Sequence, residues 1–244
     1  MKNTGRINGK RIFLIIISLA ILVICANRVR LHYARTAVEQ ARIAYDQKDY
    51  DLAISNYSRA IKMGYEKDSN LLWRGRAYYY GKRDFDMAIA DFTKAIELRP
   101  DYYVYYMWRG RAYRQKMEYD SAIADFSKAI NIDSNSSYGG HDKFVERGNV
   151  YADKGDYALA ILDYDRAIAE IDAMVARRLQ LHIEDPGFGW DNNTELYQWR
   201  DEALAQRSYV ERKLNNSGWE ESSISNEIIR QITEAFRNIF EGED

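Results

Sequence analysis

The sequence predicts an all-α fold, a solenoid of stacked antiparallel helical hairpins, and two observations carry this prediction. One phrase (Ala-Ile, two residues, an aromatic residue, two residues, Ala-Ile) occurs four times, beginning at Ala53, Ala88, Ala122 and Ala160. The successive spacings are 35, 34 and 38 residues, and a period of about 34 residues is typical of stacked helical hairpins. The chain also has twenty tyrosines but only two prolines among its 244 residues, which suits long helices joined by tight turns.

In each hairpin the phrase belongs to the second helix, and a different pattern marks the first. Trp-Arg-Gly-Arg-Ala-Tyr begins at Trp73 and again at Trp108, and the fourth hairpin has a related stretch around Gly148. Ala41 occupies the glycine position of the first hairpin. A glycine inside a helix costs about 1 kcal/mol relative to alanine. Its recurrence at one position therefore predicts that the paired second helix approaches closely there.

These patterns divide the chain into hairpins and a C-terminal extension. The four hairpins are expected at residues 36–66, 69–100, 104–134 and 142–172, within a repeat region spanning 27–172. In the extension, residues 173–244, helix is expected to continue to about His182 and to break at 185–189, where proline and glycine cluster. Helices are then expected at 194–214 and 223–240. Because a solenoid needs its open end covered, the first is interpreted as a cap, and the second either docks on the solenoid or reaches a partner.

The repeated elements resemble those of the tetratricopeptide-repeat family. The resemblance covers roughly residues 36–172 and rests on Gly-x-x-Tyr in the first helices and Ala-x3-aromatic-x2-Ala in the second helices, repeated in register. It implies a right-handed superhelical solenoid whose first helices line a concave groove. In that family the groove binds an extended or helical peptide of another protein.

A paired substitution pattern links the two helices of each hairpin. The residue before the glycine position is Gln40 in the first hairpin and arginine in the other three; the residue before the second-helix aromatic is Asn56 in the first and aspartate in the others. Since arginine occurs wherever aspartate does, we expect a charge-assisted pair in each of hairpins two to four. The predicted scaffold pairs are Arg74–Asp91, Arg109–Asp125 and Arg147–Asp163.

The family resemblance assigns a second set of residues to the groove. In that family the residue just after the glycine points into the groove. The positions so assigned are Arg42, Arg76, Arg111 and Asn149, with Tyr45, Tyr79 and Arg114 one turn later. Successive arginines suit carboxylates, so an acidic partner is one expectation. The alternative is that these arginines pair with local acids or stay solvated.

The N-terminal segment adds a membrane expectation. Residues 1–11 are basic and residues 12–26 are uncharged and apolar, which as a helix would cover about 22 Å. Three interpretations remain open: an uncleaved anchor, which the residues around Ile24 and Cys25 favour, a cleaved signal peptide, and a lipoprotein signal. More basic residues precede the apolar run than follow it. This favours a single-pass chain with its repeats on the outer, periplasmic or extracytoplasmic side.

Composition narrows the function class. The formal net charge is −2, whereas a nucleic-acid-binding surface is usually basic. One cysteine and three scattered histidines give no metal-ligand spacing, and no phosphate loop or nucleophile–base pattern stands out. The sequence therefore predicts no cofactor, no catalysis, and a membrane-tethered scaffold that binds a partner protein or peptide. The alternative is a structural subunit of a cell-envelope assembly or secretion complex that docks through its C-terminal helix.

Overall fold

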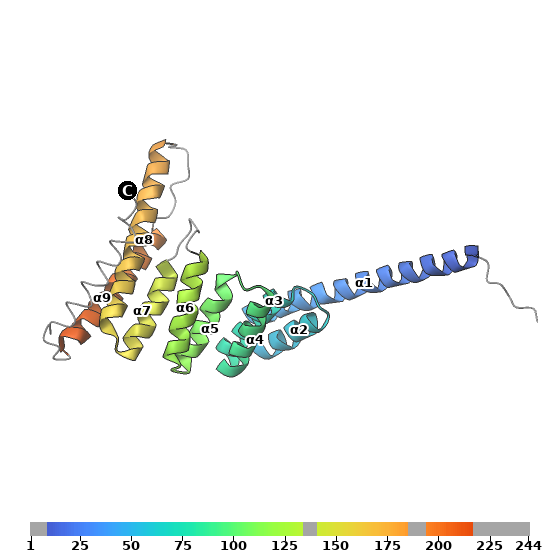
Figure 1. Cartoon of the computed structure of the whole chain (residues 1–244), viewed down its shortest axis with the longest axis horizontal. Coiled ribbons are helices and arrows are strands. Elements are labelled where there is room, and N and C mark those ends of the chain that lie inside the picture. The colour runs from blue at the N-terminus through green and yellow to red at the C-terminus, as the bar shows by residue number, and fades with distance from the viewer. Residues whose placement is uncertain (1–8, 134–140, 185–193, 217–244) are drawn as a thin grey trace, which may run out of the picture. The chain divides into compact units, whose positions relative to one another are not determined.

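The structure is a computed structural model of the chain, and it describes residues 9–133, 141–184 and 194–216 (Figure 1). These residues form α-helices and one π-helical turn, and none of them lies in a β-strand. The predicted all-α solenoid of helical hairpins is therefore confirmed. The chain divides into two compact units, residues 1–135 and 136–244, which are described separately.

The first unit holds three hairpins. Each pairs a first helix with the second helix that follows, as α1 with α2, α3 with α4, and α5 with α6. Stacking arises because α2 also packs against α3, and α4 against α5. The elements are α1 (Gly9–Asp46), α2 (Tyr50–Lys62), α3 (Lys67–Ala77), the π-helical turn η1 (Tyr78–Lys82), α4 (Phe85–Leu98), α5 (Tyr103–Gln115) and α6 (Tyr119–Asp133).

The second unit holds the fourth hairpin and one further helix. The hairpin consists of α7 (His141–Lys154) and α8 (Tyr157–Glu184), and α9 (Thr194–Asn216) packs against α8. The α9 helix corresponds to the helix expected at 194–214. The end of the helix expected at 185–189 and the helix expected at 223–240 lie outside the described residues.

Helix α1 is longer than the sequence patterns suggested. The apolar run 12–26 and the first repeat helix from residue 36 were expected as separate segments, but they form one helix of 38 residues. No glycine or proline occurs between residues 10 and 46, so nothing in that stretch ends the helix. The apolar side chains from Phe13 to Ile24 are exposed. By length and composition this helix could cross a membrane, a test that a signal sequence also passes.

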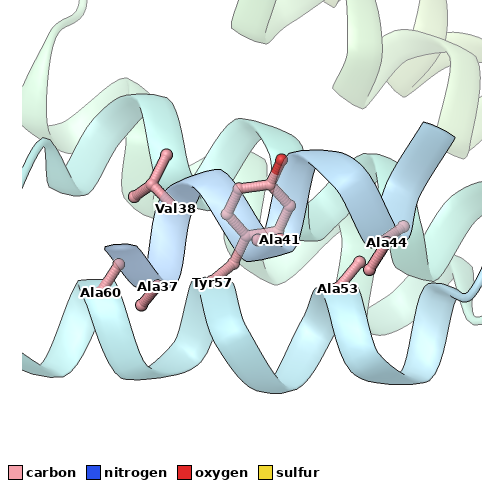
Figure 2. Close-up of a cluster of buried hydrophobic side chains, with 8 residues drawn as sticks. Ala37, Val38, Ala41, Ala44, Ala53, Tyr57 and Ala60 are labelled. Atoms are coloured by element: carbon pink, nitrogen blue, oxygen red, sulfur yellow. The ribbon is translucent and has the colours of Figure 1, made fainter. Parts of the chain in front are cut away.

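Small residues bring the paired helices together. In the first hairpin the alanines of α1, among them Ala41, face Ala53, Tyr57 and Ala60 of α2 (Figure 2), and all four of these side chains are fully buried. The alanines and the aromatic of the repeated phrase are fully buried in the other hairpins too. The phrase therefore builds the interface within each hairpin.

The interface within each hairpin also explains why glycine recurs in the first helices. A Cβ atom at Gly75 would lie 2.5 Å from the ring of Phe92, and one at Gly110 would lie 3.0 Å from Phe126. Contacts of that length force a neighbour to move. The close approach that the sequence predicted is therefore confirmed, and the second-helix aromatic is the group that requires it.

The turn inside a hairpin has a constant hydrogen-bond pattern. Lys48, Met117 and Gly155 adopt positive φ, and the next residue donates its N–H to the carbonyl five residues earlier, as Glu118 does to Tyr113. This is the Schellman arrangement of a helix C-terminus. The acidic residue then caps the second helix: the Asp49 side chain accepts from the Leu52 N–H.

The second hairpin departs from this pattern by one residue. Its Ala-Ile phrase begins 35 residues after that of the first hairpin, because one extra residue lies between Gly75 and Asp84. The Asp84 N–H accordingly reaches the carbonyl of Tyr78, six residues earlier rather than five. The π-helical turn η1, a single turn of the kind that occurs within α-helices, accommodates the insertion.

We expect Met117→Gly to stabilise the protein by about 1 kcal/mol. Met117 has φ of 60°, a conformation that costs a residue with a Cβ about 1–2 kcal/mol, and its side chain is 73% exposed, so little packing is lost. Urea unfolding followed by far-ultraviolet circular dichroism measures the change. The mirror control is Gly155→Met, which should destabilise by a similar amount; equal stability of all three proteins would contradict the argument.

Candidate functional site

The residues assigned to a groove lie on the first helices. In the first unit, Arg42 and Tyr45 are on α1, Arg76 is on α3, Tyr79 is in η1, and Arg111 and Arg114 are on α5; these six residues are called the first-helix face. Arg42 is exposed, and the other five are partly buried. Asn149 is on α7 in the second unit.

Arg76 is held between two indole rings. Its guanidinium carbon lies 4.2 Å from the ring centroid of Trp73 and 4.6 Å from that of Trp108, and the ring of Tyr45 is 5.6 Å away. Cation–π attraction of this kind is worth about 0.5–2 kcal/mol, with the larger values at desolvated sites. The two rings lie against the guanidinium, and the Arg76 side chain also makes a hydrogen bond with Tyr45.

The same indole also contacts the next arginine. The guanidinium carbon of Arg111 lies 4.7 Å from the Trp108 centroid. Tyr79 and Tyr80 meet the Trp108 ring edge-on, with centroids 5.9 and 5.7 Å away. Two arginines of neighbouring hairpins thus share one aromatic support, and Tyr79 and Tyr80 of the second hairpin belong to it.

Two buried polar atoms near this cluster have no hydrogen-bond partner within the described chain: Arg76 Nε and the hydroxyl of Tyr57. Burial is the main cause that raises the pKa of Tyr57 to about 12, with the charge of Arg42 opposing it. Burial likewise raises the pKa of Tyr45, against the charge of Arg76. An unsatisfied buried polar group costs about 1–3 kcal/mol, so this region departs from the packing of the other hairpins.

Asn149 has a different environment from the arginines with which it was grouped. Its Oδ1 accepts a hydrogen bond of 2.8 Å from the hydroxyl of Tyr164, the second-helix aromatic of the same hairpin. The contact gives the amide a role inside the fourth hairpin. In the first hairpin Tyr57 occupies the place of Tyr164, but Arg42 stands where Asn149 does, and the Tyr57 hydroxyl has no hydrogen-bond partner among the described residues.

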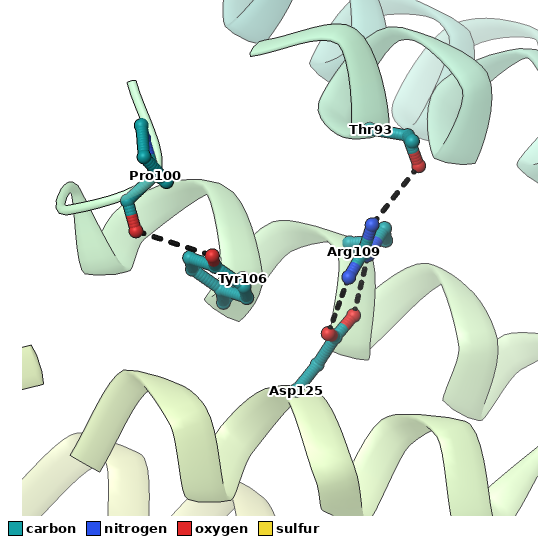
Figure 3. A network of polar contacts seen from close by, with 5 residues as sticks. All are labelled: Thr93, Pro100, Tyr106, Arg109 and Asp125. Atoms are coloured by element: carbon teal, nitrogen blue, oxygen red, sulfur yellow. Dashed lines mark hydrogen bonds and ion pairs between the residues drawn. The ribbon is translucent and has the colours of Figure 1, made fainter. Parts of the chain in front are cut away.

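The structure brings the three predicted scaffold pairs into bidentate contact. Arg109 donates from Nε and Nη2 to the two carboxylate oxygens of Asp125 at 2.8 and 2.7 Å (Figure 3). Arg74 makes the same contacts with Asp91, and Arg147 makes them with Asp163. All six side chains lie largely out of solvent.

Each of the first two arginines also reaches the preceding hairpin. Arg74 Nη1 donates to the Ser58 hydroxyl at 2.9 Å, and Arg109 Nη1 donates to the Thr93 hydroxyl at 3.1 Å. Burial raises the pKa of Asp125, although Arg109 opposes the shift. These side chains are occupied inside the solenoid, which separates them from the arginines of the first-helix face.

Sequence reasoning missed the two tryptophans that support the face. Trp73 and Trp108 occupy the same position, two residues before the glycine, in hairpins two and three. Their repetition was visible, but the rings matter only because the following arginine folds back over them. That geometry depends on the conformations of side chains from two hairpins. The repeat spacing of the sequence does not predict these conformations.

No group of three or more histidine, cysteine, aspartate or glutamate side chains that could hold a metal ion occurs in the part of the chain that the structure describes. The residues of the first-helix face offer donors and aromatic surface. Such a set is suited to binding carboxylates and peptide groups.

Two family models that match the chain describe the same repeat. The sequence model of the tetratricopeptide repeat matches residues 38–83 and 78–137, and a second model of the same repeat matches residues 144–170. No curated protein matches the chain. Among solved structures, the chain is similar to the MamA protein, with 21% identity and a TM-score of 0.52 over 78% of this chain and 97% of that one.

A second similar structure is YrrB, described as a tetratricopeptide-repeat protein with an unusual peptide-binding site. It is 19% identical, with a TM-score of 0.50 over 67% of this chain and 87% of that one. The TPR2B domain of yeast Sti1, solved in complex with pHsp70, is 26% identical over 50% of this chain and 94% of that one, with a TM-score of 0.45.

Proposed function

Because the chain belongs to the tetratricopeptide-repeat family, we propose that it is a protein-interaction scaffold without catalysis that binds an extended, acidic peptide segment of a partner. The binding surface is the first-helix face, together with the supporting indoles of Trp73 and Trp108. The peptide lies along the concave groove that the family resemblance implies. The Arg–Asp pairs hold the hairpins and take no part in binding.

The observation that carries this proposal is the environment of Arg76. Its guanidinium carbon lies over the rings of Trp73 and Trp108, and its Nε is buried without a hydrogen-bond partner in the part of the chain that the structure describes. A cation that is stacked in this way loses little side-chain entropy on binding an anion. Arg111 on the same indole supplies a second donor, so consecutive hairpins can each take one carboxylate.

The proposal includes a membrane tether. Residues 12–26 at the start of α1 are exposed and apolar where they are described, and the basic segment 1–11 precedes them. We assign them to a single-pass anchor, with residues 27–172 as the four repeats and 173–244 as the extension, on the outer side of the membrane. A cleaved signal would leave the repeats intact and remove only the tether.

Arg76→Glu should abolish selection of acidic peptides. The full chain in lipid nanodiscs is panned against a display library of random ten-residue peptides, and sequences rich in aspartate and glutamate should be enriched. For a synthetic peptide made from an enriched sequence, Arg76→Glu should weaken binding at least about tenfold, because a repulsive charge replaces the stacked cation. Quenching of tryptophan fluorescence reports binding, since Trp73 and Trp108 lie against Arg76.

Two variants make the result interpretable. Arg59→Glu changes the same charge at an exposed position of α2, outside the first-helix face, and should bind within about twofold of the wild type. Arg76→Lys keeps the charge but loses the planar donor, and should bind more weakly than the wild type. Enrichment of non-acidic peptides, or equal losses in Arg59→Glu and Arg76→Glu, would refute the proposal.

A further inference from the structure

Helix α1 runs without interruption from the apolar run 12–26 into the first hairpin. The side chains from Phe13 to Tyr33 are exposed, and the buried residues begin at Ala34. Figure 1 shows α1 continuing well beyond the other helix of its hairpin. From Ala26 to Ala34 the helix advances only about 12 Å. A bilayer that holds the apolar run therefore lies close to the hairpin.

The dimensions of a bilayer place its surface near the first buried residues. With α1 along the bilayer normal, the apolar run covers about 22 Å, whereas a hydrocarbon core is about 30 Å thick. A core centred on the run extends about 4 Å beyond each end of it and reaches about residue 29. The headgroup layer adds about 5–8 Å and ends at about residues 32–34. Ala34 thus marks the level at which the headgroups end and the hairpin begins.

The C-terminal end of α2 lies at the same level as this part of α1. The two helices are antiparallel, and Figure 2 shows Ala60 beside Ala37 at one end of the hairpin. Lys62 follows two residues later, about 3 Å nearer to the bilayer. Tyr65, in the connection to α3, packs against the same cluster as Ala37, which keeps the connection beside α1. Residues 27–35 and 62–67 are called the membrane-side end of the first hairpin.

The membrane-side end is basic, whereas the opposite end of the same hairpin is acidic. The membrane-side end has five basic residues and one acidic residue, while residues 46–51 have one basic and three acidic residues. At the opposite end Asp51 is paired with Lys82 at 2.6 Å. The five basic side chains are exposed and form no ion pair with any residue that the structure describes: Arg28, Arg30, Arg35, Lys62 and Lys67. These cations are therefore available to an external anion.

Lipid phosphate is the anion that lies at this level. Arginine and lysine bind phosphate through charge-assisted hydrogen bonds, and tyrosine is enriched at membrane–water interfaces. Tyr33, two residues before Arg35, is 61% exposed. Both kinds of side chain that suit a headgroup layer thus occur where the bilayer dimensions place that layer.

We infer that the membrane-side end of the first hairpin binds phospholipid headgroups, with its five cations on lipid phosphates and Tyr33 in the interface. This inference rests on the membrane anchor proposed above. It places Arg42, eight residues beyond Ala34, about 12 Å above the headgroups. A peptide bound at the first-helix face then lies close to the membrane.

Depth-dependent fluorescence quenching in liposomes tests the inference. The full chain carrying Cys25→Ser is reconstituted with phosphatidylcholine and phosphatidylglycerol, and a dye is attached to one new cysteine, from Leu19→Cys, Glu66→Cys or Gln47→Cys. A nitroxide on the lipid headgroup should quench the dye at position 66 at least about threefold more than the dye at position 47, which lies about 20 Å above the headgroups. A nitroxide on the acyl chain should quench the dye at position 19, which checks the anchor separately.

Two charge variants of the Glu66→Cys protein test the role of the cations. Lys62→Glu with Lys67→Glu should reduce headgroup quenching at least about twofold, because the new charges repel lipid phosphates. Lys48→Glu with Arg83→Glu makes the same charge change at exposed positions near the turns within the hairpins and should leave the quenching unchanged. Circular dichroism checks that both variants fold.

The outcomes separate a failure of the anchor from a failure of the inference. An unquenched dye at position 19 would overturn the anchor and the inference together. If that dye is quenched but the headgroup nitroxide acts equally at positions 66 and 47, the inference is wrong and the anchor stands. Equal quenching in the two charge variants would overturn the binding of lipid phosphate by the cations.

Discussion

Replacing Arg109 with methionine should destabilise the protein by about 3 kcal/mol at neutral pH. The substitution leaves Asp125, whose side chain is 7% exposed, without its cation, and breaking a buried ion pair from one side typically costs about 3–5 kcal/mol. The lower value is expected because Arg109 itself stays 18% exposed. Urea unfolding of the full chain, followed by circular dichroism, measures the loss.

The double variant Arg109→Met with Asp125→Leu should recover most of that stability. Burial already raises the pKa of Asp125 in the native pair, which shows that desolvating the carboxylate is costly even with Arg109 present. Apolar side chains that replace both partners remove this cost and are often neutral or stabilising. A double variant as unstable as the single one would show that the pair contributes more than its desolvation costs.

The single variant should also acquire a pH dependence. Without Arg109 the pKa of Asp125 rises further above its ordinary value of 3.8, so the folded protein holds a proton that the unfolded chain releases. Stability from such a group is present below the unfolded pKa and is lost as pH rises through the folded pKa. The cost of Arg109→Met relative to the wild type should therefore shrink as the pH is lowered from 7 towards 4.

Tyr57→Phe should stabilise the protein by about 1–2 kcal/mol, the second-largest change that we expect. The Tyr57 hydroxyl is fully buried and has no hydrogen-bond partner in the described chain, and leaving such a group unpaired costs about 1–3 kcal/mol. Hairpins two and three already carry phenylalanine at this place, so the ring alone fits. Thermal and urea unfolding should both shift upwards.

The matched variant Tyr164→Phe should move in the opposite direction. Its hydroxyl donates to Asn149, and removing it leaves the amide oxygen without that donor, at a cost of about 1 kcal/mol. Two identical substitutions in equivalent positions should thus have effects of opposite sign. Equal effects would mean that the Tyr57 hydroxyl is as well hydrogen-bonded as that of Tyr164.

The repeated sequence predicted the hairpin interior well because the same kinds of contact recur at equivalent positions in the four hairpins. The glycine opposite Phe92 and the Arg–Asp contacts could be located from position alone, since each requires two residue types at fixed places. The π-helical turn left a trace in the 35-residue spacing, but the spacing does not say whether a helix or a loop takes the extra residue.

The candidate site was predicted less completely for a physical reason. The family resemblance placed Arg76 on the face, whereas its support by Trp73 and Trp108 comes from side-chain stacking between hairpins. Asn149 was grouped with the arginines by position, yet its contact with Tyr164 depends on a hydroxyl that only two hairpins possess. Such contacts depend on chemistry that varies between repeats.

The unbroken α1 helix has a consequence for orientation about its own axis. Each residue of an α-helix advances the chain by about 100° of rotation, and no flexible joint separates Ala26 from the buried residues that begin at Ala34. The number of residues between them therefore sets the azimuth of the first hairpin relative to the apolar end. Adding two residues would turn it by about 200°, whereas adding seven would restore nearly the same azimuth, so helical phase, as well as length, is encoded in this stretch.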